Sequence, residues 1–521
     1  MVEKYLNSRF ITLYVIPFIF GSLTILSFEP FNLTIINLII FPLFFYFIVY
    51  INKKSKSVYR IKPYKKNLFI FGLVFGFGFY LSGISWIANS LTFDENFKNL
   101  IPLAIIFIPL FLSLFVGLIT LLIGPYLKLN FVSLLIFSAS LSFSDYLRAH
   151  LLTGFPWNLW AYSTTSMIEI LQIINLIGLY SYNLLVITIF TFPVIFLFKI
   201  SKIKKIIITI FILIIIFSIY IYGNYKINKN IDTVNNSEKT YVKIISPNFD
   251  LKYGLSIKEI EERFQKLIRY SDPDKDKKTL FIWPEGVFSG YSYDQILMFK
   301  EVIFKNFSNK HYIIFGTNTS NSIKSGFYNS ILVINNNFDV VQSYNKRKLV
   351  PFGEFLPFEK ILQNFGFKKI TQGYQSFSAD DRRDLIKLNN YNFVPLICYE
   401  VIYSGKINKS EKNYDFILNI SEDGWFGNSI GPYQHYSHLI FRSIEEGKAV
   451  IRSANNGISA YISPKGQVID KILPTDKGFI EFRSFKKSNK TIFSSQGNKI
   501  FFYFLFIYIS LIFFLKLREN K

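Results

Sequence analysis

Glu285, Lys346 and Cys398 each stand at the end of a short apolar run that is typical of a buried strand. In α/β folds, functional side chains gather beyond the carboxyl ends of the strands. We therefore expect these three side chains to be displayed rather than packed inside the strands that precede them. A carboxylate, an ammonium and a thiol in one place could perform acyl chemistry.

The proposed chemistry is nucleophilic catalysis. A free cysteine has a pKa of ~8.5 and needs a neighbouring base or cation to react at neutral pH. Glu285 can supply the base, and Lys346 can supply a cation that also stabilises an oxyanion. The residues alone leave plainer interpretations open. A lone cysteine is most often a small buried hydrophobe, and glutamates and lysines beside strands are most often solvated.

The segment 232–490 has the composition of a soluble domain, in which β-branched runs alternate with helical patterns. The spacing of Ile257, Ile260, Phe264 and Ile268 predicts an amphipathic helix over 256–270. Further elements are predicted as strands at 241–246, 280–283, 312–315, 328–334, 338–344, 393–397, 416–420 and 448–453, a helix at 437–447, and hairpins at 335–337 and 456–457. This mixture predicts an α/β sandwich.

The rest of the chain is predicted to be a membrane domain. Long apolar runs cross a bilayer when they reach ~20 residues. Eight such spans are predicted, at 10–28, 33–51, 67–91, 100–124, 131–149, 178–198, 206–223 and 499–516. We expect the first to be retained, because it has no small-residue cleavage site. The expected organisation is a seven-helix membrane domain over 1–223, a globular domain over 232–490 and a final membrane helix over 499–516.

Basic residues in short loops predict the orientation of the spans. They lie in loop 52–66 (Lys53, Lys54, Lys56, Arg60, Lys62, Lys65, Lys66), at Lys128, in loop 199–205 (Lys199, Lys202, Lys204, Lys205) and in the tail (Lys516, Arg518, Lys521). If eight spans alternate, all of these segments fall on one side. The positive-inside rule then puts both termini in the cytoplasm and 224–498 outside.

Composition excludes several other classes. The chain has 521 residues, is 50% hydrophobic and contains 59 Phe, which is too apolar for an ordinary soluble protein of this size. Its net charge of +23 is attributed to the loops beside the spans, so no nucleic-acid partner is expected. One cysteine permits no internal disulfide. His435 and His438 lie three apart on a predicted helix, but a metal site needs more ligands. No metal and no cofactor are expected.

The longer motifs resemble a known family. Glu285, Lys346 and Cys398 resemble the Glu–Lys–Cys triad of the nitrilase superfamily of carbon–nitrogen hydrolases. The pattern Tyr-x-Lys-x-x-Leu-Val-Pro-Phe-Gly-Glu at 344–354, Cys-Tyr-Glu at 398–400, and the segments 425–427 and 431–435 are similar to bacterial apolipoprotein N-acyltransferases. So are 154–157 and 455–457. The resemblance covers nearly the whole chain.

The resemblance implies a fold and roles for residues. The expected fold is a bundle of about eight transmembrane helices plus a nitrilase-like αββα sandwich. Glu285 would be the general base, Lys346 the oxyanion stabiliser and Cys398 the acylated nucleophile. Residues expected to support the site or the substrate are Glu354, Tyr399, Glu400, Tyr253 and Trp425. The backbone N–H of Tyr399 could complete the oxyanion hole.

This chain departs from the family pattern at three places. Tyr253 stands where the family has Trp, Asp145 stands where it usually has Glu, and Ser421-Glu422-Asp423-Gly424 replaces Ser-Asn-Asp-Ala. An aromatic ring is kept at Tyr253. These departures concern substrate preference more than reaction type.

The activity implied is the transfer of a fatty acyl chain from a membrane phospholipid, through a cysteine thioester, to the N-terminal amine of S-diacylglyceryl-cysteine in apolipoproteins. The expected location is the bacterial inner membrane, with the catalytic domain on the periplasmic side, and the expected state is a monomer. Two alternatives stay open. One is a membrane-anchored amidase or nitrilase that uses water. The other is a non-enzymatic transporter or receptor, although apart from Asp145 and Arg148 few charges lie in the spans.

Overall fold

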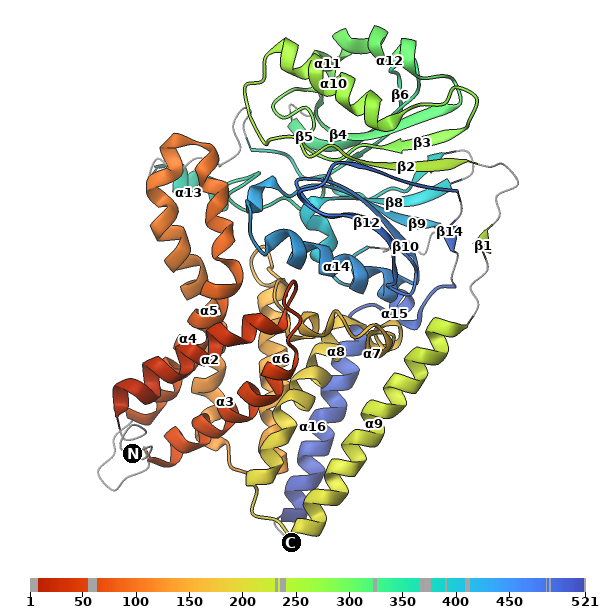
Figure 1. Ribbon diagram of the computed structural model, residues 1–521. Helices are drawn as coiled ribbons and strands as arrows, with labels where there is room; N and C mark the ends of the chain where they lie inside the picture. Colours follow the sequence, from red (N-terminus) through yellow and green to blue (C-terminus); the bar gives the residue numbers. More distant parts are fainter. Residues whose placement is uncertain are drawn as a thin grey trace. The chain divides into compact units, whose positions relative to one another are not determined.

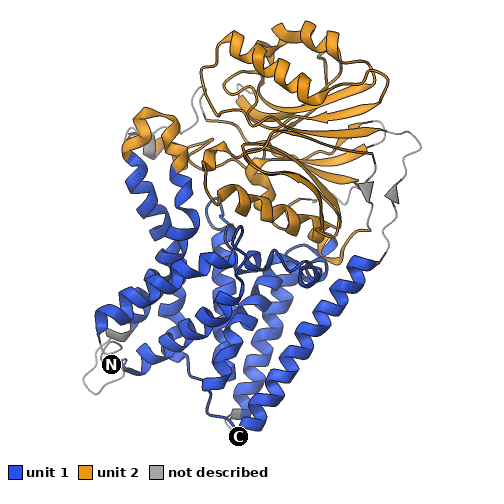
Figure 2. Cartoon of the chain, viewed as in Figure 1, with its two compact units in different colours: residues 1–88, 100–228, 495–521 blue, residues 89–99, 229–494 orange. Residues whose placement is uncertain are grey.

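The computed structural model describes residues 8–54, 63–229, 233–234, 240–321, 326–364, 369, 376–388, 391–407, 413–483, 485–486 and 489–519. The predicted basic positions Lys56, Arg60, Lys62 and Lys521 lie outside these residues. The chain divides into two compact units, coloured in Figure 2. Unit 1 comprises residues 1–88, 100–228 and 495–521, and unit 2 comprises 89–99 and 229–494.

Unit 1 is helical (Figure 1). Its helices are α2 (Ile16–Thr24), α3 (Ile35–Lys54), α4 (Pro63–Ile84), α5 (Ile101–Ile123), α6 (Phe131–His150), α7 (Ile168–Leu171), α8 (Ile174–Thr191), α9 (Lys202–Asn228) and α16 (Lys499–Glu519). A helix lies at each of the eight predicted spans. Among the described residues, six helices are long and apolar enough to cross a membrane.

The predicted count of eight spans is not confirmed. The N-terminal apolar helix, Ile11–Ser27, is shorter than the six. Helix α6 is long enough, but Asp145, Arg148 and several serines make it less apolar. The six are Ile35–Lys54, Lys65–Phe93, Glu95–Tyr126, Ile174–Leu197, Lys202–Asn228 and Lys499–Arg518.

Small residues let the helices of unit 1 approach closely. A Cβ on Gly72 of α4 would lie 2.0 Å from Oγ1 of Thr120 on α5. The same Thr120 hydroxyl donates to the Leu68 carbonyl at 2.9 Å. Close contact between small residues is how helices associate where apolar burial gives no advantage. A larger residue at Gly72 would force α4 and α5 apart.

Asp145 and Arg148, the two charges noted within the spans, form an ion pair. Arg148 Nη2 donates to Asp145 Oδ1 at 3.1 Å, and Asn183 Nδ2 donates to the other carboxylate oxygen at 3.0 Å. Arg148 Nη1 also donates to the carbonyls of Phe155 and Trp157, at 2.6 and 2.8 Å. The ion pair therefore fixes the aromatic turn that follows α6.

Unit 2 contains, in its described residues, two six-stranded sheets. The first has the order β13 (Gly478–Phe482), β2 (Tyr241–Ser246), β3 (Thr279–Ile282), β4 (His311–Asn321), β5 (Gly326–Ile334) and β6 (Val340–Asn345). The second has the order β12 (Val468–Ile472), β11 (Ser459–Ile462), β10 (Ala449–Asn455), β9 (Phe416–Glu422), β8 (Tyr391–Ile397) and β7 (Ile386–Leu388). Strands β2–β3–β4 and β8–β9–β10 run parallel.

The two sheets stack face to face, and helices cover their outer faces (Figure 1). Where β10 faces β2, the Ser453 hydroxyl donates to the Ile245 carbonyl at 2.7 Å. Helices α10 (Ile257–Ser271), α11 (Tyr293–Ile296) and α12 (Lys300–Asn306) lie over the first sheet, and α14 (Gly431–Glu446) lies over the second. Shorter elements of the unit are α13 (Glu359–Asn364), α15 (Ile492–Gln496), which extends into unit 1, and the strand pair β1 (Thr233–Val234) and β14 (Phe485–Lys486). The αββα sandwich predicted for this domain is confirmed.

Local sequence explains the main elements of unit 2. Ser256 begins α10 with a capping box, in which its hydroxyl accepts from the Glu259 N–H and its own N–H donates to the Glu259 carboxylate. Phe264 then packs on Trp283 and Phe288, which follow β3 of the first sheet. Helix α14 begins earlier than predicted, at Gly431, because Pro432 suits the first helical turn. The predicted hairpins are confirmed by the antiparallel pairs β5–β6 and β10–β11.

Candidate active site

The three predicted reactive residues follow strands from both sheets. Glu285 comes shortly after β3, Lys346 directly after β6, and Cys398 directly after β8. Stacking of the sheets brings these strand ends together, which no local pattern in the sequence specifies. The predicted placement beyond the strands is confirmed, but two of the side chains are buried, with Lys346 1% exposed and Cys398 8% exposed, and Glu285 is half-buried.

A buried network of carboxylates holds the lysine. Lys346 Nζ lies 2.8 Å from Glu354 Oε1 and 4.0 Å from Glu285 Oε1. The Asn329 amide nitrogen donates to both carboxylates, at 2.7 Å to Glu285 and 2.8 Å to Glu354. Glu354 Oε2 accepts from the Val350 N–H at 2.8 Å. The ammonium is thus fixed by Glu354 and remains in electrostatic reach of Glu285.

The remaining oxygen of Glu285 has a partner in the second sheet. Glu285 Oε2 accepts from the backbone N–H of Glu422, the last residue of β9, at 3.0 Å. Burial raises the pKa of Glu285; Lys346 opposes this rise and Glu354 reinforces it. A carboxylate with a raised pKa is a stronger base, which suits it to accept a proton from a thiol.

Cys398 sits in a strained turn. It has φ +47°, in the left-handed region that residues with a Cβ rarely adopt. Strained backbone of this kind occurs often at active sites. Burial raises the pKa of the thiol to about 12; the negative charge of Glu285 adds to the rise, and Lys346 opposes it. The thiol is therefore neutral at rest, and forming the thiolate requires a base.

The charges of the network keep the lysine protonated. Burial acts to lower the pKa of Lys346, but Glu354 and Glu285 more than offset this and raise it above its ordinary value. The Lys346 ammonium interacts electrostatically with the Cys398 thiol, and such a cation can stabilise both a thiolate and an oxyanion. The site therefore contains a base, a cation and a nucleophile in one buried cluster.

Glu400 anchors the two loops that hold the lysine and the cysteine. Its carboxylate accepts from the Tyr344 hydroxyl at 2.8 Å, from the Arg347 N–H at 3.1 Å and from the Ile397 N–H at 2.9 Å. Arg383 Nη2 forms an ion pair with it at 2.9 Å. Glu400 thus ties the residues flanking Lys346 to the end of β8. Arg383 was not anticipated from the sequence, because its segment shows no periodic pattern.

The predicted supporting aromatics fall into two places. Tyr399 is buried directly after the cysteine, and its ring packs edge-on against Tyr403 at 5.4 Å. Tyr253 and Trp425 are half-buried, and their ring centroids lie 6.1 Å apart. Tyr253, which replaces the tryptophan of the family, therefore keeps an aromatic contact.

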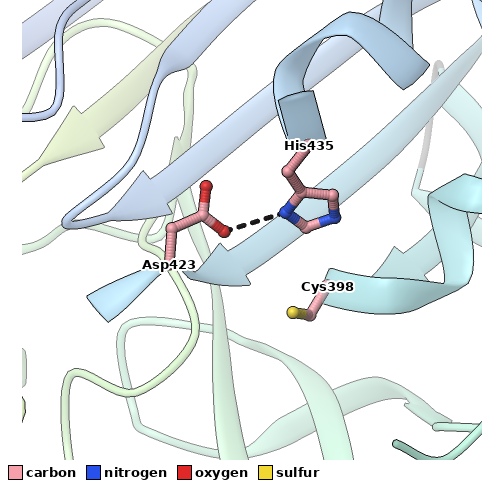
Figure 3. Close-up of side chains that lie close together, drawn as sticks. All are labelled: Cys398, Asp423 and His435. Carbon is pink, nitrogen blue, oxygen red and sulfur yellow. Dashed lines mark hydrogen bonds and ion pairs between the residues drawn. The ribbon is translucent and has the colours of Figure 1, made fainter. Parts of the chain in front are cut away.

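A second polar cluster lies next to Cys398 (Figure 3). One ligand-type atom from each of Cys398, Asp423 and His435 lies within 4.8 Å of the others. His435 Nδ1 and Asp423 Oδ1 are 3.0 Å apart. Asp423 also accepts from the Ser421 hydroxyl at 2.7 Å. From the sequence, His435 was noted as a possible metal ligand and as part of the motif 431–435, and Asp423 as part of a segment that departs from the family pattern; a contact between them was not predicted.

An arginine supplies the positive charge of this cluster. Arg452 Nη2 lies 2.6 Å from Asp423 Oδ2 and 3.1 Å from His435 Nδ1. Although burial acts to raise the pKa of Asp423, Arg452 and His435 hold it well below its ordinary value. A guanidinium at this distance would repel a divalent ion, so the three side chains are poorly suited to hold a metal. The cluster instead braces the turn around Cys398, because Asp423, His435 and Arg452 come from three different elements.

Comparisons with known proteins cover most of the chain. Residues 20–192 match the family profile described as Apolipoprotein N-acyltransferase N-terminal domain, and residues 253–480 match that of Carbon-nitrogen hydrolase. A protein of Rhodopseudomonas palustris named Apolipoprotein N-acyltransferase is 30% identical over 478 residues, 88% of this chain and 87% of that protein.

Two further relatives carry the same name. The protein of Bradyrhizobium diazoefficiens is 31% identical over 468 residues, which is 86% of this chain and 85% of the relative. That of Rickettsia prowazekii is 30% identical over 438 residues, which is 82% of this chain and 86% of the relative. The similarity therefore spans both the helical unit and the sandwich unit.

Proposed function

Because the chain belongs to the apolipoprotein N-acyltransferase family, we propose that it transfers a fatty acyl chain through a thioester on Cys398. The donor is a membrane phospholipid, and the acceptor is the N-terminal amine of S-diacylglyceryl-cysteine in an apolipoprotein. The chain is a membrane enzyme of the acyltransferase class. The buried cluster of Glu285, Lys346 and Cys398 is the observation that supports the mechanism most strongly.

The first half-reaction forms the thioester. Glu285 takes the thiol proton of Cys398, and the sulfur attacks the ester carbonyl of the phospholipid. A C–S bond forms, and Lys346 stabilises the oxyanion, which the Tyr399 N–H can also approach. The tetrahedral intermediate then breaks its C–O bond. Glu285 returns the proton to the leaving oxygen, which departs as lysophospholipid.

The second half-reaction makes the amide. The uncharged α-amine of the acceptor attacks the thioester carbonyl, and Glu285 takes a proton from the amine. The C–S bond breaks as the C–N bond forms, and the thiol of Cys398 is regenerated with that proton. Glu354 is proposed to hold Lys346 in position throughout, and Glu400 to hold the loops on both sides of the site. No metal and no cofactor take part in this scheme.

The proposed organisation has a membrane domain over 1–223, a catalytic domain over 232–490 and a final membrane helix over 499–516. We place the catalytic domain on the periplasmic side of the inner membrane, with both termini in the cytoplasm. Basic residues at Lys53, Lys128 and Lys516 support this orientation. Reporter fusions after residues 60 and 235 should then report opposite sides of the membrane, and equal signals would contradict the topology.

A transfer assay tests the function. The purified chain, a phospholipid and a diacylglyceryl peptide with a free N-terminus should yield an N-acylated peptide and lysophospholipid in equal amounts. Release of free fatty acid that does not depend on the peptide would support a hydrolase that uses water instead. A transporter would give neither product. Glu285→Gln should abolish amide formation while the protein remains folded and membrane-inserted.

A further inference from the structure

A short segment that connects two membrane helices belongs to the catalytic unit. Residues 89–99 lie in the chain between α4 and α5, yet they pack with unit 2. Except for Asp94, they belong to two 3-10 helices, η3 (Ser85–Phe93) and η4 (Glu95–Leu100). The sequence analysis predicted that a membrane span continues to residue 91 and the next begins at residue 100, so these contacts were not anticipated.

The segment is attached to the turn that follows β9. Asn89 Nδ2 donates to the Phe426 carbonyl at 2.7 Å, and the Ser429 hydroxyl donates to the same carbonyl at 2.8 Å. Gly427 has φ +60°, and a Cβ there would lie 2.7 Å from Asn89 Nδ2. The turn therefore needs glycine at Gly427 both for its backbone and for the approach of Asn89.

The same attachment brings a third ring to the aromatic pair described above. The Phe93 ring meets Trp425 edge-on, with centroids 5.2 Å apart and an interplanar angle of 75°. Trp425 in turn meets Tyr253 at 6.1 Å and 45°. All three side chains are half-buried. The rings form a row, here called the aromatic row (Phe93, Trp425 and Tyr253), that is partly open to a ligand.

The middle ring of the aromatic row, Trp425, follows closely in the chain on two residues that contact the site. Asp423, two residues before Trp425, lies in the cluster with Cys398. Glu422, three residues before Trp425, donates its backbone N–H to Glu285 Oε2 at 3.0 Å. An acyl group bound to the sulfur of Cys398 has to extend from this place. Half-buried aromatic rings are suited to contact its methylene groups.

We propose that Phe93 is a specificity-determining residue that contacts the acyl chain of the phospholipid donor, and that Asn89 is a positioning residue that holds it there. The inference rests on the proposed function and deepens it. Part of the contact with the acyl chain then comes from residues 89–99, the segment between α4 and α5. Asn89 acts through the Phe426 carbonyl and touches no reacting atom.

The physical basis is loss of apolar contact. Each methylene group removed from water contributes about a fourfold change in binding. If the Phe93 ring covers about two methylene groups of a long chain, its removal exposes them to water. A short acyl chain that ends before Phe93 loses no apolar contact when the ring is removed. We therefore expect Phe93→Ala to lower the preference for a long chain over a short one by about tenfold.

The test uses the full-length protein and the acylation half-reaction alone. Diacyl phospholipids with one headgroup and either C16 or C8 chains are supplied without acceptor, and the initial rate of acyl addition is followed by intact mass. Phe97→Ala is the matched control, because it removes the same ring from the same segment and Phe97 forms no ring pair with any residue that the structure describes. Phe93→Trp retains an aromatic surface and should keep the wild-type preference.

The expected results separate this inference from its alternatives. Phe93→Ala should slow acylation by C16 about tenfold and leave the C8 rate within about twofold, and Phe97→Ala should match wild type. Asn89→Asp, which removes the N–H donor, should shift the preference in the same direction. An unchanged preference, or an equal loss of rate for both chain lengths, would overturn the inference. A wild-type protein that acquires no adduct would overturn the proposed function itself.

Discussion

The Glu354→Gln substitution tests whether Glu354 holds the Lys346 ammonium away from Glu285. In the structure, Lys346 Nζ lies 2.8 Å from Glu354 Oε1 and 4.0 Å from Glu285 Oε1. In Glu354→Gln the lysine loses its closer anionic partner, and we expect it to move into direct contact with Glu285. Asn329, which donates to both residues at 2.7 and 2.8 Å, can still bridge them. The base would then be held in a tight ion pair.

The size of the effect follows from those distances. With an effective dielectric constant of about 20, two unit charges attract by about 4 kcal/mol at 4.0 Å and about 6 kcal/mol at 2.8 Å. The additional ~2 kcal/mol favours the ionised form of Glu285 and corresponds to a fall of ~1.5 units in its pKa. Loss of the negative charge of Glu354, which raises the pKa of Glu285, acts in the same direction. Glu285 becomes a weaker base.

The assay is the pH dependence of acyl addition to Cys398. Glu285 works in its ionised form, so activity is lost as pH falls through its pKa. The acid limb of Glu354→Gln should therefore move to lower pH by about one unit, while the plateau rate falls about tenfold because the base is weaker. Glu359→Gln, which neutralises an exposed glutamate nearby, should leave both unchanged. An acid limb that stays in place, or moves to higher pH, would refute the proposal that Glu354 keeps Lys346 from pairing tightly with Glu285.

Three further predictions follow from the same contacts. Lys346→Ala should lower the rate of transfer by ~10²–10³-fold, whereas Lys348→Ala should remain active in the same assay. The reverse result would show that Lys348, and not Lys346, is the catalytic lysine. Glu400→Gln should destabilise the protein by about 3–5 kcal/mol, measured by thermal unfolding, because it breaks a buried ion pair with Arg383; an unchanged melting temperature would contradict its anchoring role. Burial raises the pKa of Glu422 from 4.5 to about 8, although hydrogen bonds from Asn455, Asn456 and the Gly424 N–H act to lower it. The unfolded chain therefore loses this proton first, so stability should decline as pH rises from about 5 to 8. Glu422→Gln should reduce that decline. If the melting temperature of the wild-type protein were the same from about pH 5 to 8, the raised pKa of Glu422 would be refuted.

The sequence predicted the positions of the reactive residues because strand ends are local features. Pro284 and the β-branched runs before Glu285 and Cys398 mark where β3 and β8 stop. The capping box at Ser256 marks the start of α10 in the same way. Such signals depend on neighbours in the chain, so they can be interpreted without the fold.

The contacts between distant segments could not be predicted in this way. Asn329 bridges Glu285 and Glu354 from the middle of a strand, where an asparagine looks like an ordinary polar residue. Arg452 pairs with Asp423 across 29 positions of the chain. Asn89 is further still from Phe426, at a separation of 337. Each pairing depends on how the sheets and the connection 89–99 come together, which no local pattern records.

The most direct measurement of the central claim is the mass of the protein after incubation with phospholipid and no acceptor. We expect the mass to increase by one fatty acyl group. Hydroxylamine at neutral pH should remove this group, as it removes a thioester, and a diacylglyceryl peptide should accept it to form an amide. Since Cys398 is the one cysteine of the chain, thiol labelling should fall in step with acylation, and Cys398→Ala should acquire no adduct. If Cys398→Ala still transferred the acyl chain, or if the adduct resisted hydroxylamine, the thioester mechanism would be contradicted.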